Sequence, residues 1–170
     1  MDARHETDSL GLLAATMGPT ARAYHTGYVV RDLDRAMAVL GEAMGIRWAP
    51  VMDYPGAMVR TRDGILEIPQ LSLTYSTLPV HVELIQEAPG TLWVAGSDLR
   101  GHHIGVWADD LEAESARLEA LGLPLHTHGL DADGKMWSFA YHETPFGLYV
   151  ELVDAVAKSF YPHWFAQAAS

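Results

Sequence analysis

Two histidines and two glutamates recur at matching places in this chain, and they are the side chains best suited to chemistry. Moving the sequence by 78 residues places His25 on His103. Moving it by 68 residues places Glu83 on Glu151, inside the matching tetrapeptides Val-Glu-Leu-Ile and Val-Glu-Leu-Val. Imidazole nitrogens and carboxylate oxygens are ligands of divalent metal ions, so the four residues predict a metal site with nitrogen and oxygen donors.

The repeat extends beyond these donors and indicates that the chain is a duplication. The 78-residue shift also aligns four further pairs: Gly27 with Gly105, Asp32 with Asp110, Leu33 with Leu111, and Leu40 with Leu118. A lone histidine or glutamate in a half-exposed strand usually needs no functional explanation. Packing explains shared apolar positions, but it does not explain a histidine on the first strand and a glutamate on the last strand of both copies. The repetition therefore favours a functional role for the four residues.

Two copies related by a pseudo-twofold axis would bring these donors together from four separate strands. Such a group suits a six-coordinate ion, with two positions left for water or substrate, and differs from a closed structural zinc site with four protein ligands. We expect one divalent ion per site. Zinc, nickel or cobalt is favoured, with manganese or iron as alternatives.

Composition narrows the class of protein and of partner. The chain has 170 residues, of which 49% are hydrophobic, as expected for a globular domain. Its formal charge of −11 disfavours nucleic acid and anionic membranes as partners. No apolar run approaches the roughly 20 residues that span a bilayer. The absence of cysteine excludes thiolate ligands and fits a cytoplasmic location.

The first copy of the repeat, residues 21–88, predicts one strand, one helix and three further strands. A strand over 23–30 places His25, Gly27 and Val29 on one face. Asp32 is a suitable N-cap for the helix that follows, and Gly45 is a suitable stop. Turn signals then divide residues 46–87 into about three strands.

The second copy, residues 101–154, follows the same order after a connector over 89–100. Residues 1–20 form an N-terminal arm in this interpretation, and residues 155–170 a C-terminal helical tail. That tail carries Phe160, Trp164 and Phe165. It could cover the sheet, a dimer interface or a substrate.

Four more residues are candidates for contacting a substrate. His81 shares a strand face with Glu83, although a plain solvent-facing histidine is an equal alternative. Trp137, Phe139 and Tyr141 alternate along one later strand, where they could line a pocket for an apolar or aromatic substrate. Core packing is the default explanation for these aromatic residues.

Taken together, these motifs resemble the vicinal oxygen chelate superfamily, which includes glyoxalase I, methylmalonyl-CoA epimerase, extradiol dioxygenases and bleomycin-resistance proteins. The resemblance covers residues 22–154 and rests on four segments: 25–33, 82–86, 101–105 and 144–152. It implies an α+β fold in which two tandem βαβββ modules form an open, curled mixed β-sheet barrel around one metal. It also implies that His25, Glu83, His103 and Glu151 are the ligands. Family members are often homodimers, so we expect a homodimer here.

The ligand set also bears on the reaction that this resemblance implies. Isomerases, epimerases and glyoxalase I keep a ligand at all four places, whereas extradiol dioxygenases lack the one at Glu83 and antibiotic-binding members commonly lack the set. We therefore expect a metal-dependent isomerase, epimerase or lyase that polarises a substrate carbonyl and moves the adjacent proton. A ring-cleaving dioxygenase and a non-catalytic small-molecule binder are the alternatives.

The same resemblance offers two kinds of base and constrains the substrate. Glu83 or Glu151 is the expected catalytic base, with metal-bound water as the competitor. Glyoxalase I typically has an arginine toward glutathione where this chain has Val29, which disfavours a glutathione adduct. We expect instead a small molecule with a carbonyl or enolisable group.

Overall fold

The computed structural model describes residues 23–96 and 98–168, so the predicted arm over 1–20 lies outside the described residues. The first module contains β1 (Ala23–Val30), α2 (Leu33–Met44), β2 (Met52–Thr61), β3 (Gly64–Tyr75) and β4 (His81–Gln86). The second contains β5 (His103–Ala108), α3 (Leu111–Ala120), β6 (Leu125–Leu130), β7 (Met136–Glu143) and β8 (Tyr149–Asp154). The expected α+β fold of paired βαβββ modules is confirmed.

The helices α2 and α3 begin at the aspartates that the repeat aligns, and α2 ends at the predicted glycine. The carboxylate of Asp32 accepts a hydrogen bond from the backbone N–H of Arg35 at 2.9 Å, and Asp110 caps α3 through Ala113 at the same distance. Gly45 follows α2 with φ 65°, a left-handed conformation that favours glycine. Each module therefore turns from its first strand into a helix at an aspartate in the same repeat position.

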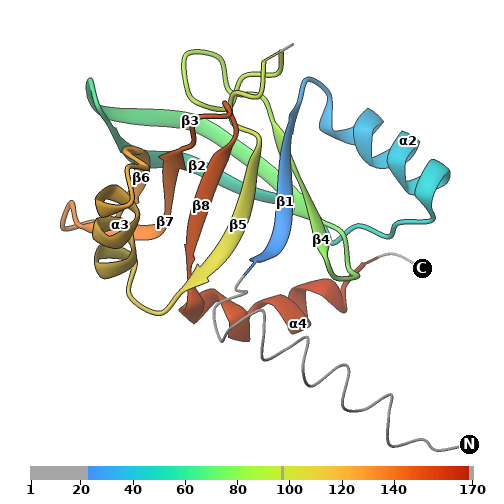
Figure 1. Cartoon of the computed structure of the whole chain (residues 1–170). Coiled ribbons are helices and arrows are strands. Elements are labelled where there is room, and N and C mark those ends of the chain that lie inside the picture. Colours follow the sequence, from blue (N-terminus) through green and yellow to red (C-terminus); the bar gives the residue numbers. More distant parts are fainter. Residues whose placement is uncertain (1–22, 97, 169–170) are drawn as a thin grey trace, which may run out of the picture.

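The eight strands form one closed barrel in the order β1-β4-β3-β2-β6-β7-β8-β5. Within each module the first and last strands pair in parallel, β1 with β4 and β5 with β8, and the modules meet through antiparallel β1 and β5. The sheet is more closed than the open form we expected, because β2 pairs with β6 at three positions, from Val59 to Thr61. Figure 1 shows α2 and α3 on opposite sides of this barrel.

Apolar side chains divide into three clusters around the sheet. The largest fills the barrel and includes Ile68, Ile85 and Trp93. A second lies between α3 and the outer face of the second module, where Leu111 and Leu118 meet Leu152. The third forms where the C-terminal tail meets the barrel, and its buried members are Ala49, Tyr75 and Trp164.

The tail crosses one end of the barrel, at the bottom in Figure 1. It is not one continuous helix, because a 3₁₀ helix, η1 (Ala155–Ser159), gives way to a short α-helix, α4 (Tyr161–Phe165). The indole N–H of Trp164 donates to the backbone oxygen of Pro50 at 2.9 Å. Of the three roles considered for the tail, the structure shows that it covers the end of the sheet. Among the described residues, no helix is both long and apolar enough to cross a bilayer.

Candidate metal centre

Four strands deliver the repeated histidines and glutamates to one buried point. His25 comes from β1, Glu83 from β4, His103 from β5 and Glu151 from β8. Their exposed fractions are 0, 2, 3 and 6%, and one donor atom from each lies within 4.8 Å of the others. The group could therefore hold a metal ion, as the sequence repeat predicted.

The donor atoms lie close together in pairs. His103 Nε2 is 2.9 Å from Glu83 Oε2 and 3.3 Å from Glu151 Oε2. His25 Nε2 is 3.0 Å from Glu151 Oε2 and 3.4 Å from Glu83 Oε2. The two Nε2 atoms are 2.9 Å apart. Each histidine thus approaches both glutamates, and the arrangement is nearly symmetric between the modules.

Strand register explains why the donors meet. In the two parallel pairs, Gly27 lies opposite Glu83 and Gly105 lies opposite Glu151. Across the antiparallel pair of β1 and β5, His25 lies opposite Gly105 and Gly27 lies opposite His103. Each histidine therefore faces the glycine of the other module. That glycine is paired in turn with the glutamate of its own module.

These two glycines leave the space that the imidazole rings occupy. A Cβ atom on Gly27 would lie 1.8 Å from Cε1 of His103, and one on Gly105 would lie 1.8 Å from Cε1 of His25. No side chain fits at such distances, so any residue other than glycine would displace a ligand. The sequence contains His-x-Gly in both copies, which marks these glycines as a repeated feature. Their role could not be predicted, because it depends on how β1 pairs with β5.

Hydrogen bonding orients the two imidazoles unequally. His103 donates from Nδ1 to the backbone oxygen of Gly101 at 2.9 Å, which leaves Nε2 for the centre. Nδ1 of His25 is buried without a hydrogen-bond partner among the described residues. The His25 ring instead makes T-shaped contacts with two tyrosine rings, Tyr24 at 4.4 Å and Tyr75 at 5.1 Å between centroids.

Mutual electrostatics set the protonation of the group without metal. Burial alone would lower the pKa of His103, but Glu151 and Glu83 raise it to about 10. Burial alone would raise the pKa of Glu151, but His103 and His25 lower it to about 2. The pKa of His25 is raised and that of Glu83 is lowered by the same pairing, against the effect of burial. Without metal, His103 is therefore protonated and Glu151 is ionised at neutral pH.

The donor set fits a divalent cation. Oε2 of Glu151 is buried and has no hydrogen-bond partner among the described residues, although it faces both histidines. Buried carboxylate oxygens normally accept hydrogen bonds or bind metal. A divalent ion would balance the two carboxylates once the histidines are neutral, and mixed nitrogen and oxygen donors suit first-row metals.

The four residues predicted to contact substrate differ in burial and in distance from the donor group. Tyr141 is buried with its hydroxyl 3.4 Å from Nδ1 of His103, and Phe139 packs edge-on against it. His81 lies at the barrel end, where its Nδ1 donates to the backbone oxygen of Ser76 at 2.7 Å and its ring meets Phe165. Trp137 is 55% exposed, and the structure shows no ring contact between it and the other described aromatic residues. Only Tyr141 is brought directly to the donor group, and substrate contact stays a prediction for all four residues.

Several aromatic residues at the site were missed by sequence reasoning. Tyr75 stands opposite Glu83 in the pairing of β3 and β4 and is 3% exposed. Tyr24 stacks on Trp107 with centroids 3.7 Å apart, and its hydroxyl lies 3.4 Å from that of Tyr161 in the tail. No local motif marks these residues, because their meeting depends on strand register and on where the tail returns.

Comparison with known proteins agrees with this geometry. Residues 24–141 match the family model described as Glyoxalase/Bleomycin resistance protein/Dioxygenase superfamily. A search of curated proteins found no match.

Solved structures show the same fold at low sequence identity. Methylmalonyl-CoA epimerase from Mycobacterium tuberculosis is 17% identical, with a TM-score of 0.53 over 79% of this chain and 88% of that one. A hypothetical protein from Bacillus halodurans is 14% identical, with a TM-score of 0.52 over 78% and 92%. Methylmalonyl-CoA epimerase from Streptomyces coelicolor, in complex with 2-nitronate-propionyl-CoA, is 15% identical, with a TM-score of 0.50 over 81% and 99%.

Proposed function

Because the chain belongs to the Glyoxalase/Bleomycin resistance protein/Dioxygenase superfamily, we propose that it is a metal-dependent isomerase, epimerase or lyase of the glyoxalase-like type. The observation that carries the proposal is the buried group of His25, Glu83, His103 and Glu151. These four residues would hold the ion. When bound, a divalent metal supplies Lewis-acid polarisation of a carbonyl oxygen, which acidifies the neighbouring C–H.

The glutamates are the candidate proton carriers of this reaction. Oε2 of Glu83 hydrogen-bonds to His103, whereas Oε2 of Glu151 has no such partner among the described residues. Glu151 is paired with His25 at 3.0 Å and His103 at 3.3 Å but keeps this oxygen without a hydrogen bond, so we take it as the first candidate base. The pKa of Glu151 is lowered to about 2, against the effect of burial, by His103 and His25, so this carboxylate is ionised at neutral pH.

Exclusion of water is the second contribution of the chain. Tyr75 and Tyr141 are buried beside His25 and His103 respectively, so aromatic rings cover both histidines. A dry site strengthens the electrostatic interactions that stabilise negative charge on the substrate oxygen. In this proposal the histidines supply metal ligands, and the tyrosines exclude water from the four donor residues.

The substrate in this proposal is a small molecule with a carbonyl or enolisable group. An acyl-CoA is one candidate, because the epimerase from Streptomyces coelicolor was solved with 2-nitronate-propionyl-CoA. A homodimer, a cytoplasmic location, and the exclusion of nucleic acid and membranes as partners stay predictions.

Solvent deuterium exchange tests the reaction class and the base together. The native chain, Glu151→Gln and Glu83→Gln would be incubated in deuterium oxide with a panel of 2-oxo acids and acyl-CoA thioesters. Glutamine keeps an oxygen donor for metal but cannot accept the proton, so we expect exchange by Glu151→Gln to fall by about 100-fold or more. Glu119→Gln on the exposed face of α3 is the matched control. Full exchange by both Glu83→Gln and Glu151→Gln would remove the glutamates as bases.

A further inference from the structure

A pocket opens where the tail meets the end of the barrel. It is a cavity of ≈ 360 Å³ next to the metal centre, within the size range of small-molecule sites. Three elements of the barrel and the tail supply its main lining: Tyr24, His81, Trp107, Lys158, Tyr161 and Phe165. We call it the tail pocket.

Aromatic rings make up most of this lining and are already ordered against one another. Tyr24 and Trp107 are stacked, with centroids 3.7 Å apart and planes 11° from parallel. Tyr161 lies 5.4 Å from Trp107 and 5.3 Å from Phe165 between ring centroids. Because these contacts fix the positions of the rings, a planar apolar ligand would meet an ordered aromatic lining at little entropic cost.

The inner wall of the tail pocket is shared with the metal centre. Tyr24 contacts Tyr161 of the tail and makes a T-shaped contact with His25, at 4.4 Å between ring centroids. A ligand seated in the pocket would therefore lie one side chain away from the metal ligands.

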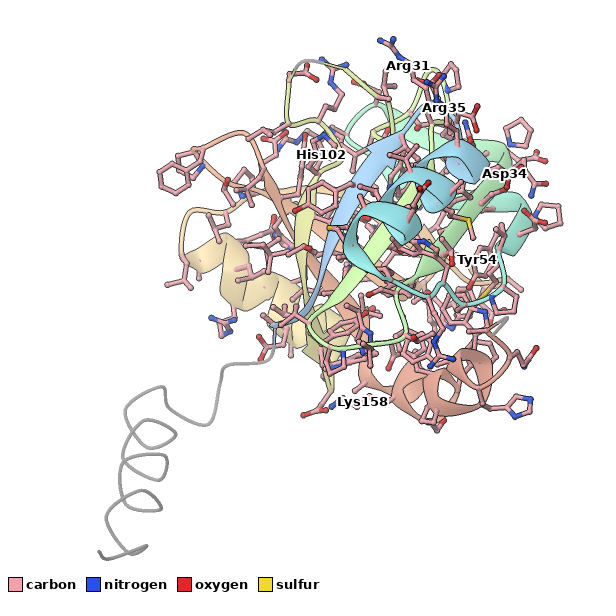
Figure 2. The ribbon with its side chains drawn as sticks, turned by 90° about the vertical axis from the view of Figure 1, so that its right-hand side faces the viewer. Arg31, Asp34, Arg35, Tyr54, His102 and Lys158 are labelled. Carbon is pink, nitrogen blue, oxygen red and sulfur yellow. The ribbon has the colours of Figure 1, made fainter. Side chains whose placement is uncertain are left out.

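A single cation stands at the pocket. Nζ of Lys158 lies 5.5 Å from the centroid of the Trp107 ring, over its face. Among the described residues, Lys158 has no ion-pair partner, whereas Arg62, Arg100 and Arg117 each pair with a carboxylate. Figure 2 places Lys158 at the lower end of the molecule, away from Arg31 and Arg35 at the top. In a chain of net charge −11, this amine is a local attraction for one negative group.

We propose that the tail pocket binds a flat aromatic carboxylate, with its ring among the aromatic rings of the lining and its carboxylate against Lys158. Tyr24 separates this pocket from the metal ligands, so the inference goes beyond the proposed function and adds a second ligand site. The C-terminal tail forms part of that site. A single carboxylate would balance the charge of Lys158, and an aromatic ring would pack against the aromatic lining of the pocket.

Equilibrium binding of simple probes tests the pocket apart from the reaction. Phenylacetate carries both a ring and a carboxylate, acetate lacks the ring, and 2-phenylethanol lacks the charge. We expect calorimetric titration of the full chain, as purified, to show phenylacetate binding one to one and at least about tenfold more tightly than either other probe. In nitrogen-correlated NMR spectra, the indole N–H of Trp107 should shift on titration while that of Trp48 stays in place.

Two matched lysine variants locate the charge. The chain has only two lysines, and Lys135 lies in the turn between β6 and β7, outside the pocket. Lys158→Met should lower the affinity for phenylacetate roughly fivefold and leave that for 2-phenylethanol unchanged, while Lys135→Met should alter neither. Equal binding of phenylacetate and 2-phenylethanol by the native chain, or an equal loss in both variants, would overturn the proposal.

The outcomes separate this inference from the proposed function. None of the probes needs metal or proton transfer to bind. Phenylacetate binding that depends on Lys158, in a chain that exchanges no substrate proton, would support the pocket and contradict the proposed reaction. Proton exchange in a chain whose tail pocket fails the probe test would support the reaction and overturn the pocket.

Discussion

The two modules share their donors but differ in what surrounds them. In both, a histidine and a glycine on the first strand and a glutamate on the last strand occupy the same register. Around His103, a backbone oxygen and Tyr141 hold the ring, and the connector residue Trp93 donates to the Tyr141 hydroxyl at 3.3 Å. Around His25, the rings of Tyr24 and Tyr75 take that place, and the aromatic residues of the tail pack against these two tyrosines. The comparison teaches that both copies keep the donor residues and their register, whereas the groups that cover each histidine differ.

The helices of the two modules also differ, in how many of their residues they bury. α3 buries Leu111, Ser115 and Leu118 against the second module, whereas α2 buries only Leu33 among its residues. α2 therefore contributes less to the core than its counterpart, although both begin at an aspartate cap.

The largest expected effect on stability and metal binding comes from replacing the glycine that both modules share, Gly27 or Gly105. Gly27→Ala or Gly105→Ala would place a methyl group inside the imidazole of the other module. We expect each to destabilise the fold by about 3 kcal/mol or more and to abolish metal binding, because a buried ligand must move. Thermal unfolding and metal analysis measure the two effects.

A glycine outside the site provides the control for that experiment. Gly96→Ala, at an exposed position of the connector, should change the free energy of unfolding by less than about 0.5 kcal/mol. A stable Gly27→Ala protein that still binds metal would show that the reciprocal packing of the modules is not required.

Metal affinity should depend on pH through both modules together. Because the pKa of His103 is raised to about 10, this imidazole is protonated at pH 7 and must lose its proton to bind metal, and the raised pKa of His25 acts in the same direction. Affinity should therefore rise as pH increases from 6 to 9 and fall as pH decreases. Zinc titrations in buffers of different ionisation enthalpy would count the protons released. Affinity without pH dependence, and without proton release, would contradict this picture of the paired charges.

The smallest expected effects concern the tyrosine hydroxyls beside the two histidines, Tyr141 near His103 and Tyr24 near His25. Tyr141→Phe leaves the buried indole N–H of Trp93 without its acceptor and should lower the free energy of unfolding by about 1 kcal/mol. Tyr24→Phe removes a longer, half-buried contact with Tyr161, at 3.4 Å, and should cost less than about 0.5 kcal/mol. Chemical denaturation would rank the two. The opposite order would mean that the tail, and not the connector, is the firmer cover.

Much of this architecture could be predicted from sequence because it repeats. His25 and His103, with their caps and helices, identified the modules, and the duplication singled out the donors. The closure of β2 on β6 had no such signal, since three pairs at the end of a strand leave no motif. The roles of Tyr75 and Tyr161 also depended on tertiary contacts between distant segments. Trp137 shows the limit of strand alternation, because it lies exposed while Tyr141 on the same strand is buried.

Metal content per chain is the measurement that tests the central claim most directly. Protein purified without added metal or chelator would be analysed for all first-row metals, beside His25→Ala and His103→Ala. The account predicts about one divalent ion per native chain and loss in both variants, because each module supplies half of the ligands. Zinc, nickel or cobalt would fit the proposed isomerase or lyase, and iron or manganese would favour the dioxygenase alternative. A native chain that holds no metal and takes up none on addition would contradict the account.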